Sequence, residues 1–273
     1  MTGPAAMPAQ GPAREPAGRL VLADLEIRFG ERRVVSIADL RLGHGEIVGL
    51  AGESGSGKSM TTLAILGLAH TVGASVRGSI TLDGQELTTL SPPDLRAIRG
   101  RRIAAIFQSP STAFSPVYKV GSMFTRALRL HGAGKSEAAD RAAEAMRQVL
   151  LAPGLLRRYP SQLSGGQLQR VAIALAVALR AEILLADEPT SALDVTVQAE
   201  VLDLLRGLRE STGMSILFIS HDLAVVAELC DRVAVMRDGL IVEQGPAGQV
   251  LSAPADPYTI ELLESIPRLA SAT

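Results

Sequence analysis

A glycine-rich segment that ends in a lysine and a serine carries the clearest chemistry of the chain: Gly52-Glu53-Ser54-Gly55-Ser56-Gly57-Lys58-Ser59. Its spacing, G-x-x-x-x-G-K-[ST], is that of a phosphate-binding loop. Glycines let the backbone curl around an anion so that successive N–H groups point at it. The Lys58 ammonium can reach the β- and γ-phosphates, and the Ser59 hydroxyl suits Mg²⁺. The segment therefore predicts a site for a nucleoside triphosphate with Mg²⁺.

The flanks of this loop fit the arrangement that it requires. Residues 46–51 predict a buried strand, and residues 60–66 predict a helix. Strand, loop and helix thus follow one another, and the positive end of the helix dipole would face the phosphates.

Two adjacent carboxylates, Asp187 and Glu188, follow a second apolar segment, 183–186, which predicts a buried strand. The carboxyl ends of parallel strands meet at the ligand edge of a sheet, so this pair is expected near the loop. Asp187 is predicted to hold Mg²⁺ and Glu188 to polarise the water that attacks the γ-phosphate.

A second glycine-rich segment, Ser164-Gly165-Gly166-Gln167, opens a predicted helix. Its hydroxyl, its backbone N–H groups and the helix dipole can all face an anion. The chain has only one loop lysine and one such carboxylate pair for two phosphate cradles. We therefore expect the second cradle to serve a nucleotide bound by a partner chain.

In their order and approximate spacing, these segments resemble the ATP-binding subunits of ABC (ATP-binding cassette) transporters. The resemblance covers residues 20 to about 267, and it is specific because Leu-Ser-Gly-Gly-Gln at 163–167 belongs to this family rather than to phosphate-loop enzymes at large. The matching motifs are 52–59, Gln108, 163–167, 183–188, 191–194 and His221.

The resemblance implies ATP and Mg²⁺ as ligands and roles for further residues. Phe29 would stack on adenine, although a strand-end core residue is the other interpretation. Gln108 would coordinate Mg²⁺ or the attacking water, His221 would contact the γ-phosphate, and Asp194 would cross a dimer interface. Two subunits would then enclose two ATP molecules, each lying between one phosphate-binding loop and the other subunit's 164–167 segment.

The expected fold is α/β: a P-loop NTPase of the ABC ATPase type with a mainly parallel core sheet, an antiparallel β subdomain and an inserted α-helical subdomain. Strands that alternate with helices predict the parallel sheet, with helices on both faces. Residues 20–28 and 33–42 predict the antiparallel part, and 109–160 has helical periodicity without strand candidates. The domain would span 19–267 and include that insertion, between a disordered tail at 1–18 and a short tail at 268–273.

The composition of the chain indicates where in the cell it is located. Lys and Arg number 27 and Asp and Glu 28, which argues against a nucleic-acid partner. The longest apolar stretch falls short of the ~20 residues of a membrane-spanning helix. We find no secretion signal, and a single cysteine suits a reducing compartment. With the resemblance, this places the chain peripherally on the cytoplasmic face of the inner membrane.

Flanking segments resemble importers of dipeptides, oligopeptides and nickel in particular: 158–162, 192–199, 241–245, 256–259 and 265–267. This implies uptake of peptides, nickel or metal chelates with a second ATPase subunit, two transmembrane permease subunits and, indirectly, an extracytoplasmic binding protein. A groove around 108–121 would receive the permease. Residues 111–116 resemble the nickel-type subunits more than the peptide-type ones, and the chain lacks the cysteine-rich extension of many oligopeptide-type subunits.

Three other functions fit the sequence less well. A soluble ABC-family ATPase usually carries two cassettes or a long coiled coil. A P-loop kinase would leave 164–167 and His221 without a role. A subunit that no longer hydrolyses ATP is disfavoured because Lys58, Gln108 and the other catalytic candidates are all present.

Overall fold

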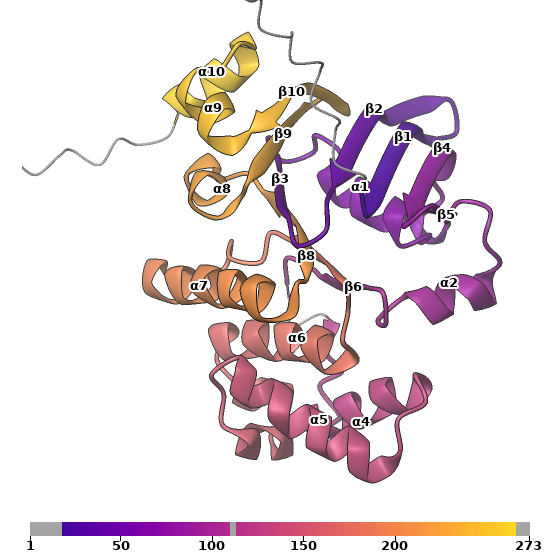
Figure 1. The fold of residues 1–273 in the computed structure, drawn as a ribbon, viewed down its shortest axis with the longest axis vertical. Coiled ribbons are helices and arrows are strands. Elements are labelled where there is room, and N and C mark those ends of the chain that lie inside the picture. Colours follow the sequence, from indigo (N-terminus) through magenta and orange to yellow (C-terminus); the bar gives the residue numbers. More distant parts are fainter. Residues whose placement is uncertain (1–17, 110–112, 266–273) are drawn as a thin grey trace, which may run out of the picture.

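The computed structural model describes residues 18–109 and 113–265 (Figure 1). Except for Gly18, the two predicted tails lie outside these residues. The strands are β1 (Leu20–Phe29), β2 (Arg32–Leu42), β3 (Ile47–Ala51), β4 (Ser75–Leu82), β5 (Gln85–Glu86), β6 (Ile103–Ile106), β7 (Ile183–Asp187), β8 (Ser215–Ser220), β9 (Arg232–Arg237) and β10 (Leu240–Pro246). The α-helices are α1 (Lys58–Ile65), α2 (Pro92–Ile98), α4 (Val120–Leu130), α5 (Lys135–Gln148), α6 (Gly165–Leu179), α7 (Val195–Thr212), α8 (Leu223–Leu229), α9 (Ala247–Ser252) and α10 (Pro257–Glu264).

The described strands form one sheet in the order β5-β4-β1-β2-β10-β9-β3-β8-β7-β6. From β9 to β6 every neighbouring pair is parallel. At the other end, β5, β4, β1 and β2 are antiparallel, and β10 links the two parts by pairing with β9 and, through Leu240 and Ser36, with β2. The predicted mainly parallel core with an antiparallel part is confirmed, and both belong to one sheet.

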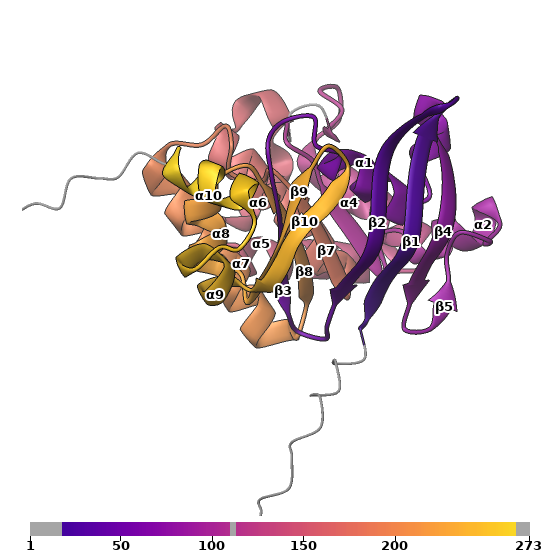
Figure 2. The same ribbon diagram turned by 90° about the horizontal axis from the view of Figure 1, so that it is seen from above.

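The central strands are apolar on both faces because helices cover both. In β7, Ile183 and Leu185 pack in one cluster with residues of α1, whereas Leu184 and Ala186 pack in another with residues of α6 and α7. All four are fully buried, and burial of such a large aliphatic side chain contributes about 2 kcal/mol. Figure 2 shows β1, β2 and β4 on one side of the molecule and α8, α9 and α10 on the other.

Between β6 and β7 the chain is helical, as the sequence predicts. In α4, Phe124 and Leu128 are fully buried, as are Ala138 and Met146 in α5, and these side chains share one cluster with α6. These helices lie at the end of the molecule remote from β10 (Figure 1). The short piece expected at 155–159 is a 3₁₀ turn that starts earlier, Pro153–Arg157, since proline suits the first helical position. The boundaries of the inserted subdomain remain a prediction.

Two helices, α9 and α1, differ from the sequence prediction. The short α9 was not predicted, because only Ala247 and Val250 of this helix are buried and so small a set shows no helical period. Helix α1 starts at Lys58, inside the glycine-rich loop, rather than at residue 60. Within the described residues, no helix combines the length and apolar character needed to cross a membrane.

Candidate nucleotide-binding site

The glycine-rich loop connects β3 to α1 and depends on the positive φ angles of its glycines, 147° at Gly52, 86° at Gly55 and 110° at Gly57. A Cβ atom on Gly52 would lie 2.1 Å from the carbonyl oxygen of Met236. The loop can therefore lie against the end of β9 only with glycine at this position.

Lys58 lies inside the curl of this loop. Its Nζ donates hydrogen bonds of 2.7 Å to the carbonyl oxygens of Gly52 and Glu53, and the residue is only 5% exposed. Burial lowers the pKa of Lys58, while the charges of Glu188, Asp187 and Glu53 act in the opposite direction. A cation thus stands among backbone N–H groups at the start of a helix, the setting that binds phosphate.

Asp187, at the end of β7, is a buried carboxylate, 4% exposed. Burial raises its pKa and the Glu188 charge adds to this effect, whereas a hydrogen bond from the Ser59 hydroxyl and the Lys58 charge lower it. Its Oδ1 has no hydrogen-bond partner among the described residues. An orphaned carboxylate oxygen beside a serine hydroxyl fits the oxygen donors that Mg²⁺ prefers.

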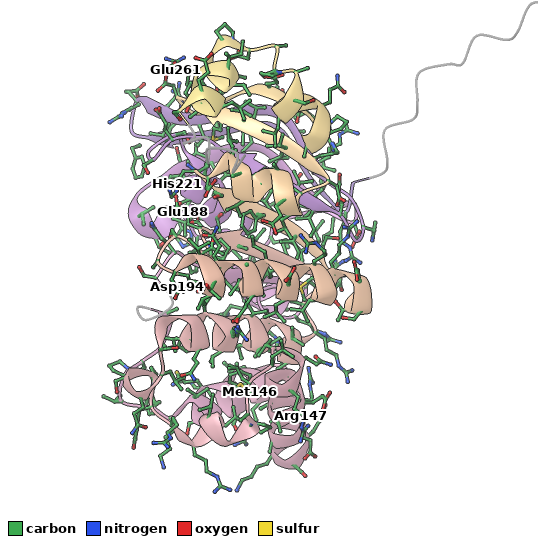
Figure 3. All side chains as sticks on the ribbon, turned by 90° about the vertical axis from the view of Figure 1, so that its left-hand side faces the viewer. Met146, Arg147, Glu188, Asp194, His221 and Glu261 are labelled. Atoms are coloured by element: carbon green, nitrogen blue, oxygen red, sulfur yellow. The ribbon has the colours of Figure 1, made fainter. Side chains whose placement is uncertain are left out.

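Glu188 joins two other predicted residues. The Gln108 amide donates a 2.8 Å hydrogen bond to Glu188 Oε2, and His221 Nδ1 lies 3.1 Å from Glu188 Oε1. The Glu188 side chain is 11% exposed and that of His221 is 52% exposed. Figure 3 shows Glu188 and His221 next to each other at the surface, where solvent or a ligand can reach them.

Sheet order explains this convergence. The strands β3, β8, β7 and β6 are parallel neighbours. The loop follows β3, His221 follows β8, the carboxylate pair ends β7, and Gln108 comes two residues after β6. Residues far apart in the sequence, such as Glu188 and His221 at 33 positions and Gln108 and Glu188 at 80, therefore meet at one edge, as expected for the carboxyl ends of parallel strands.

The second glycine-rich segment lies elsewhere. Ser164 caps α6: its Oγ accepts a 3.2 Å hydrogen bond from Gln167 N, and its own N–H donates to Gln167 Oε1. Gly166 lets α7 approach, because a Cβ there would lie 2.5 Å from a methyl group of Val197. Ser164 and Gly165 are exposed. No hydrogen bond between described residues joins this segment to Lys58 or Glu188.

No hydrogen bond between described residues joins Asp194 or Phe29 to Lys58 or Glu188. Asp194 caps α7 by accepting a 3.0 Å hydrogen bond from Val197 N, and it is exposed. In Figure 3 it lies on the same side of the molecule as Glu188 and His221, at the start of α7. Phe29 ends β1 and is 38% exposed, so it is not a core residue.

The sequence interpretation missed two supports of the glycine-rich loop. Glu53 N–H donates a 3.1 Å hydrogen bond to the Tyr258 hydroxyl, and Gly239 N–H donates a 2.9 Å hydrogen bond to the Ser56 carbonyl. Tyr258 belongs to the 256–259 segment, which in the sequence is one of the flanks that resemble peptide and nickel importers. Nothing in its spacing from the loop predicts the contact.

Comparisons with known proteins agree with this geometry. The family model described as "ABC transporter" matches residues 35–191. A putative peptide import ATP-binding protein of Brucella melitensis is 45% identical over 90% of this chain and 76% of its own length. A probable peptide ABC transporter ATP-binding protein of Sinorhizobium fredii is 44% identical over 91% and 76%. The glutathione import ATP-binding protein GsiA of Salmonella paratyphi A is 45% identical over 85% of this chain but only 39% of its own.

Solved structures share the fold. The ATP-binding cassette MJ0796, in a dimeric post-hydrolysis state with ADP and Pi, matches with a TM-score of 0.72 and 28% identity over 84% of this chain and 98% of its own. The cbiO1 protein of Clostridium perfringens matches with a TM-score of 0.76 and 23% identity over 92% and 96%. The chain thus belongs to the ABC transporter family. Within that family it is an ATP-binding, ATP-hydrolysing subunit of the importer type.

Proposed function

We propose that the residues gathered at the ends of β3, β6, β7 and β8 bind and hydrolyse Mg²⁺-ATP. The observation that carries this proposal is the placement of Glu188, hydrogen-bonded to Gln108 and His221 on the side of the sheet that also holds Lys58 and Asp187. A carboxylate held in this way can accept a proton from water, and the lysine can stabilise charge on the phosphates.

Each side chain then has a distinct role. The loop N–H groups and Lys58 bind the β- and γ-phosphates, and Phe29 offers an exposed ring for adenine. Ser59, Asp187 and Gln108 would hold Mg²⁺, which when bound neutralises charge that develops on the phosphates. Glu188 orients and deprotonates the attacking water, and His221 contacts the γ-phosphate. The hydrogen bond from Gln108 keeps Glu188 from turning away.

The site is completed by a second cassette, either a copy of this chain or a related one. Among the described residues, the side chains of Ser164, Gln167 and Asp194 hydrogen-bond only to local backbone. With Gly165 and Gly166 they are exposed or half-buried, so this set can contact a nucleotide held by the partner. The MJ0796 structure is a dimer with ADP and Pi, which supports such pairing. ATP would favour the closed pair and hydrolysis the open one.

Replacement of Glu188 by Gln tests the hydrolytic role. The amide keeps the size and hydrogen-bonding capacity of the side chain but cannot accept the water proton. We expect kcat to fall at least ~100-fold while ATP affinity stays within about twofold. Phosphate release and binding of a fluorescent ATP analogue measure the two quantities. Undiminished hydrolysis by this variant would contradict the assignment.

The cargo we propose is a peptide, because the relatives of 44–45% identity named above carry peptide or glutathione import in their names. Nickel or a metal chelate stays a second prediction. It came from the flanking segments that resemble peptide and nickel importers alike, and residues 111–116 favour the nickel type; of these, 111 and 112 lie outside the described residues.

Membrane partners would dock at a hollow of about 420 Å³ beside α4. It lies close to the predicted groove and contains exposed apolar side chains, Tyr118 at 51% and Leu130 at 78%. Its lining also includes Ala113, Phe114, Ser115, Ser122, Met123, Arg126, Ala127 and Leu175. An amphipathic helix of a permease fits such a surface, and docking there would hold the chain at the cytoplasmic face of the inner membrane.

Affinity purification in mild detergent tests the partners. We expect two permeases and a second cassette to be recovered, and the Leu130→Glu variant to lose the permeases while it retains ATP binding. The binding protein encoded with them can then be titrated with peptides and with Ni²⁺. Recovery of ribosomes or DNA instead would favour a soluble ABC-family ATPase that is not coupled to transport.

A further inference from the structure

Helix α10 contacts the phosphate-binding loop from outside the nucleotide site. The Tyr258 hydroxyl, in the first turn of α10, accepts the 3.1 Å hydrogen bond from Glu53 N–H. Tyr258 is 4% exposed, and burial raises its pKa, so the hydroxyl stays protonated at neutral pH. A buried phenol that pairs with one backbone N–H of a loop restricts how far that peptide can turn.

Residue 53 is linked to the loop lysine as well. While its N–H bonds to Tyr258, its carbonyl oxygen accepts the 2.7 Å hydrogen bond from Lys58 Nζ. The N–H and the carbonyl group belong to the same residue, so a shift of Glu53 moves the carbonyl oxygen to which Lys58 is bonded. Tyr258 therefore connects α10 to Lys58 through one residue.

The tyrosine is itself held in place. The guanidinium of Arg237 lies over its ring, 4.7 Å from the ring centre, and the carbonyl of the preceding Met236 is the group that Gly52 approaches closely. The end of β9 thus contacts both the start of the loop and the Tyr258 ring. A guanidinium over the face of a tyrosine ring is attracted to it and helps to hold the ring in place.

Two carboxylates fix the segment that carries Tyr258. Asp256 accepts a 2.8 Å hydrogen bond from Tyr258 N, which caps α10. Glu243 of β10 accepts hydrogen bonds from Ala255 N at 2.8 Å and from Asp256 N at 3.1 Å. The first turn of α10 is therefore anchored to the sheet rather than loosely appended to it.

We propose that Tyr258 is a positioning residue for ATP binding: its hydroxyl holds the Glu53 peptide so that the loop and Lys58 are set for the phosphates. The inference rests on the proposed phosphate-binding role of the loop. It assigns α10 a part in the ATPase reaction, and it explains why a tyrosine stands in the 256–259 segment.

The test compares Tyr258→Phe with the unaltered full-length chain. Phenylalanine keeps the ring under Arg237 and removes only the hydroxyl. We expect affinity for a fluorescent ATP analogue to fall about three- to tenfold, the loss of one hydrogen bond, with kcat within twofold and a melting temperature lowered by only a few degrees. Hydrogen–deuterium exchange should rise in the peptide covering 52–58 and stay unchanged in β1 and β2.

Three further variants make the outcome decisive. Tyr159→Phe, at a tyrosine that is 39% exposed and far from the loop in sequence, is the matched control and should match the unaltered chain. Tyr258→Leu removes the ring as well as the hydroxyl. If only Tyr258→Leu weakens ATP binding, or if Tyr258→Phe speeds exchange throughout the protein, the positioning role is wrong. Lys58→Ala separates the two proposals: if it leaves ATP binding intact, the proposed role of the loop fails.

Discussion

The two halves of the proposed ATP site differ in burial and in whether their side chains contact distant segments or only local backbone. Lys58 and Asp187 are buried, and Glu188 is bonded to Gln108 and His221. Ser164 and Asp194 are exposed, and within the described part of the chain their side chains bond only to the backbone of the helices that they cap. Folding of one chain thus assembles the hydrolytic groups and leaves the other half of the site facing outward.

This difference has a physical cause. The proposed hydrolytic groups lie at the ends of parallel strands. The hydrogen bonds between these strands fix the positions of the strand ends relative to one another. The outward half stands at the starts of α6 and α7, where the orphan N–H groups of each helix need only a local cap. Because the capping residue already satisfies the backbone N–H groups, such a helix start can be exposed without loss of stability. It therefore remains available to bind a partner chain.

Lys58→Ala should have the largest effect, because it removes the only cation that the loop encloses among the described residues. We expect ATP hydrolysis to fall more than ~100-fold, with weaker ATP binding. Lys135→Ala, at the exposed start of α5, is the matched control. Hydrolysis near the unaltered rate in the Lys58 variant would mean that the buried half is not the phosphate site.

Ser164→Arg separates the two halves. Because Ser164 is exposed, the longer side chain has room and would block the contact with a partner's nucleotide. The loss of the Ser164 cap of α6 should lower the free energy of unfolding by only about 1 kcal/mol. Hydrolysis should fall about 30- to 100-fold, while the affinity of the single chain for ATP stays within about twofold. Ser161→Arg, also exposed, is the control. Equal loss of ATP affinity in the Ser164 variant would place this residue in the chain's own site.

Asp194 gives the smallest effect and distinguishes capping from contact across an interface. Asp194→Ala should lower the free energy of unfolding by about 1 kcal/mol, because α7 loses its cap, whereas Asp194→Asn should keep it. Denaturant unfolding measures the difference. A fall in hydrolysis with Asp194→Asn would show that the charge, and not the cap, serves the pair of cassettes.

Much of the fold follows from local patterns in the sequence. The apolar run at 183–186 and the carboxylates after it predict a buried strand that ends at the ligand edge, and β7 has this form. The glycine spacing at 52–59 likewise predicts the strand–loop–helix order. These patterns suffice because burial and backbone geometry restrict the residue types at each position.

Contacts between segments that are distant in the sequence could not be predicted from it. The hydrogen bond between Glu53 and Tyr258 joins residues 205 positions apart, and no periodicity or spacing encodes such a pair. The continuity of the antiparallel part with the core sheet depends on Leu240 and Ser36, which also lie far apart in sequence. Both contacts depend on how β9 and β10 are aligned with their neighbours, and this alignment is determined only when the whole sheet assembles.

The central claim is that two cassettes close on ATP with the outward half of each facing the buried half of the other. Light scattering of the Glu188→Gln chain, alone and mixed with the second cassette that co-purifies with it, with and without Mg²⁺-ATP, tests it most directly. The account predicts a shift from monomer to dimer when ATP is added, and no shift when Ser164→Arg is also present. A mass that does not change with ATP, or a dimer that forms equally well with Ser164→Arg, would contradict it.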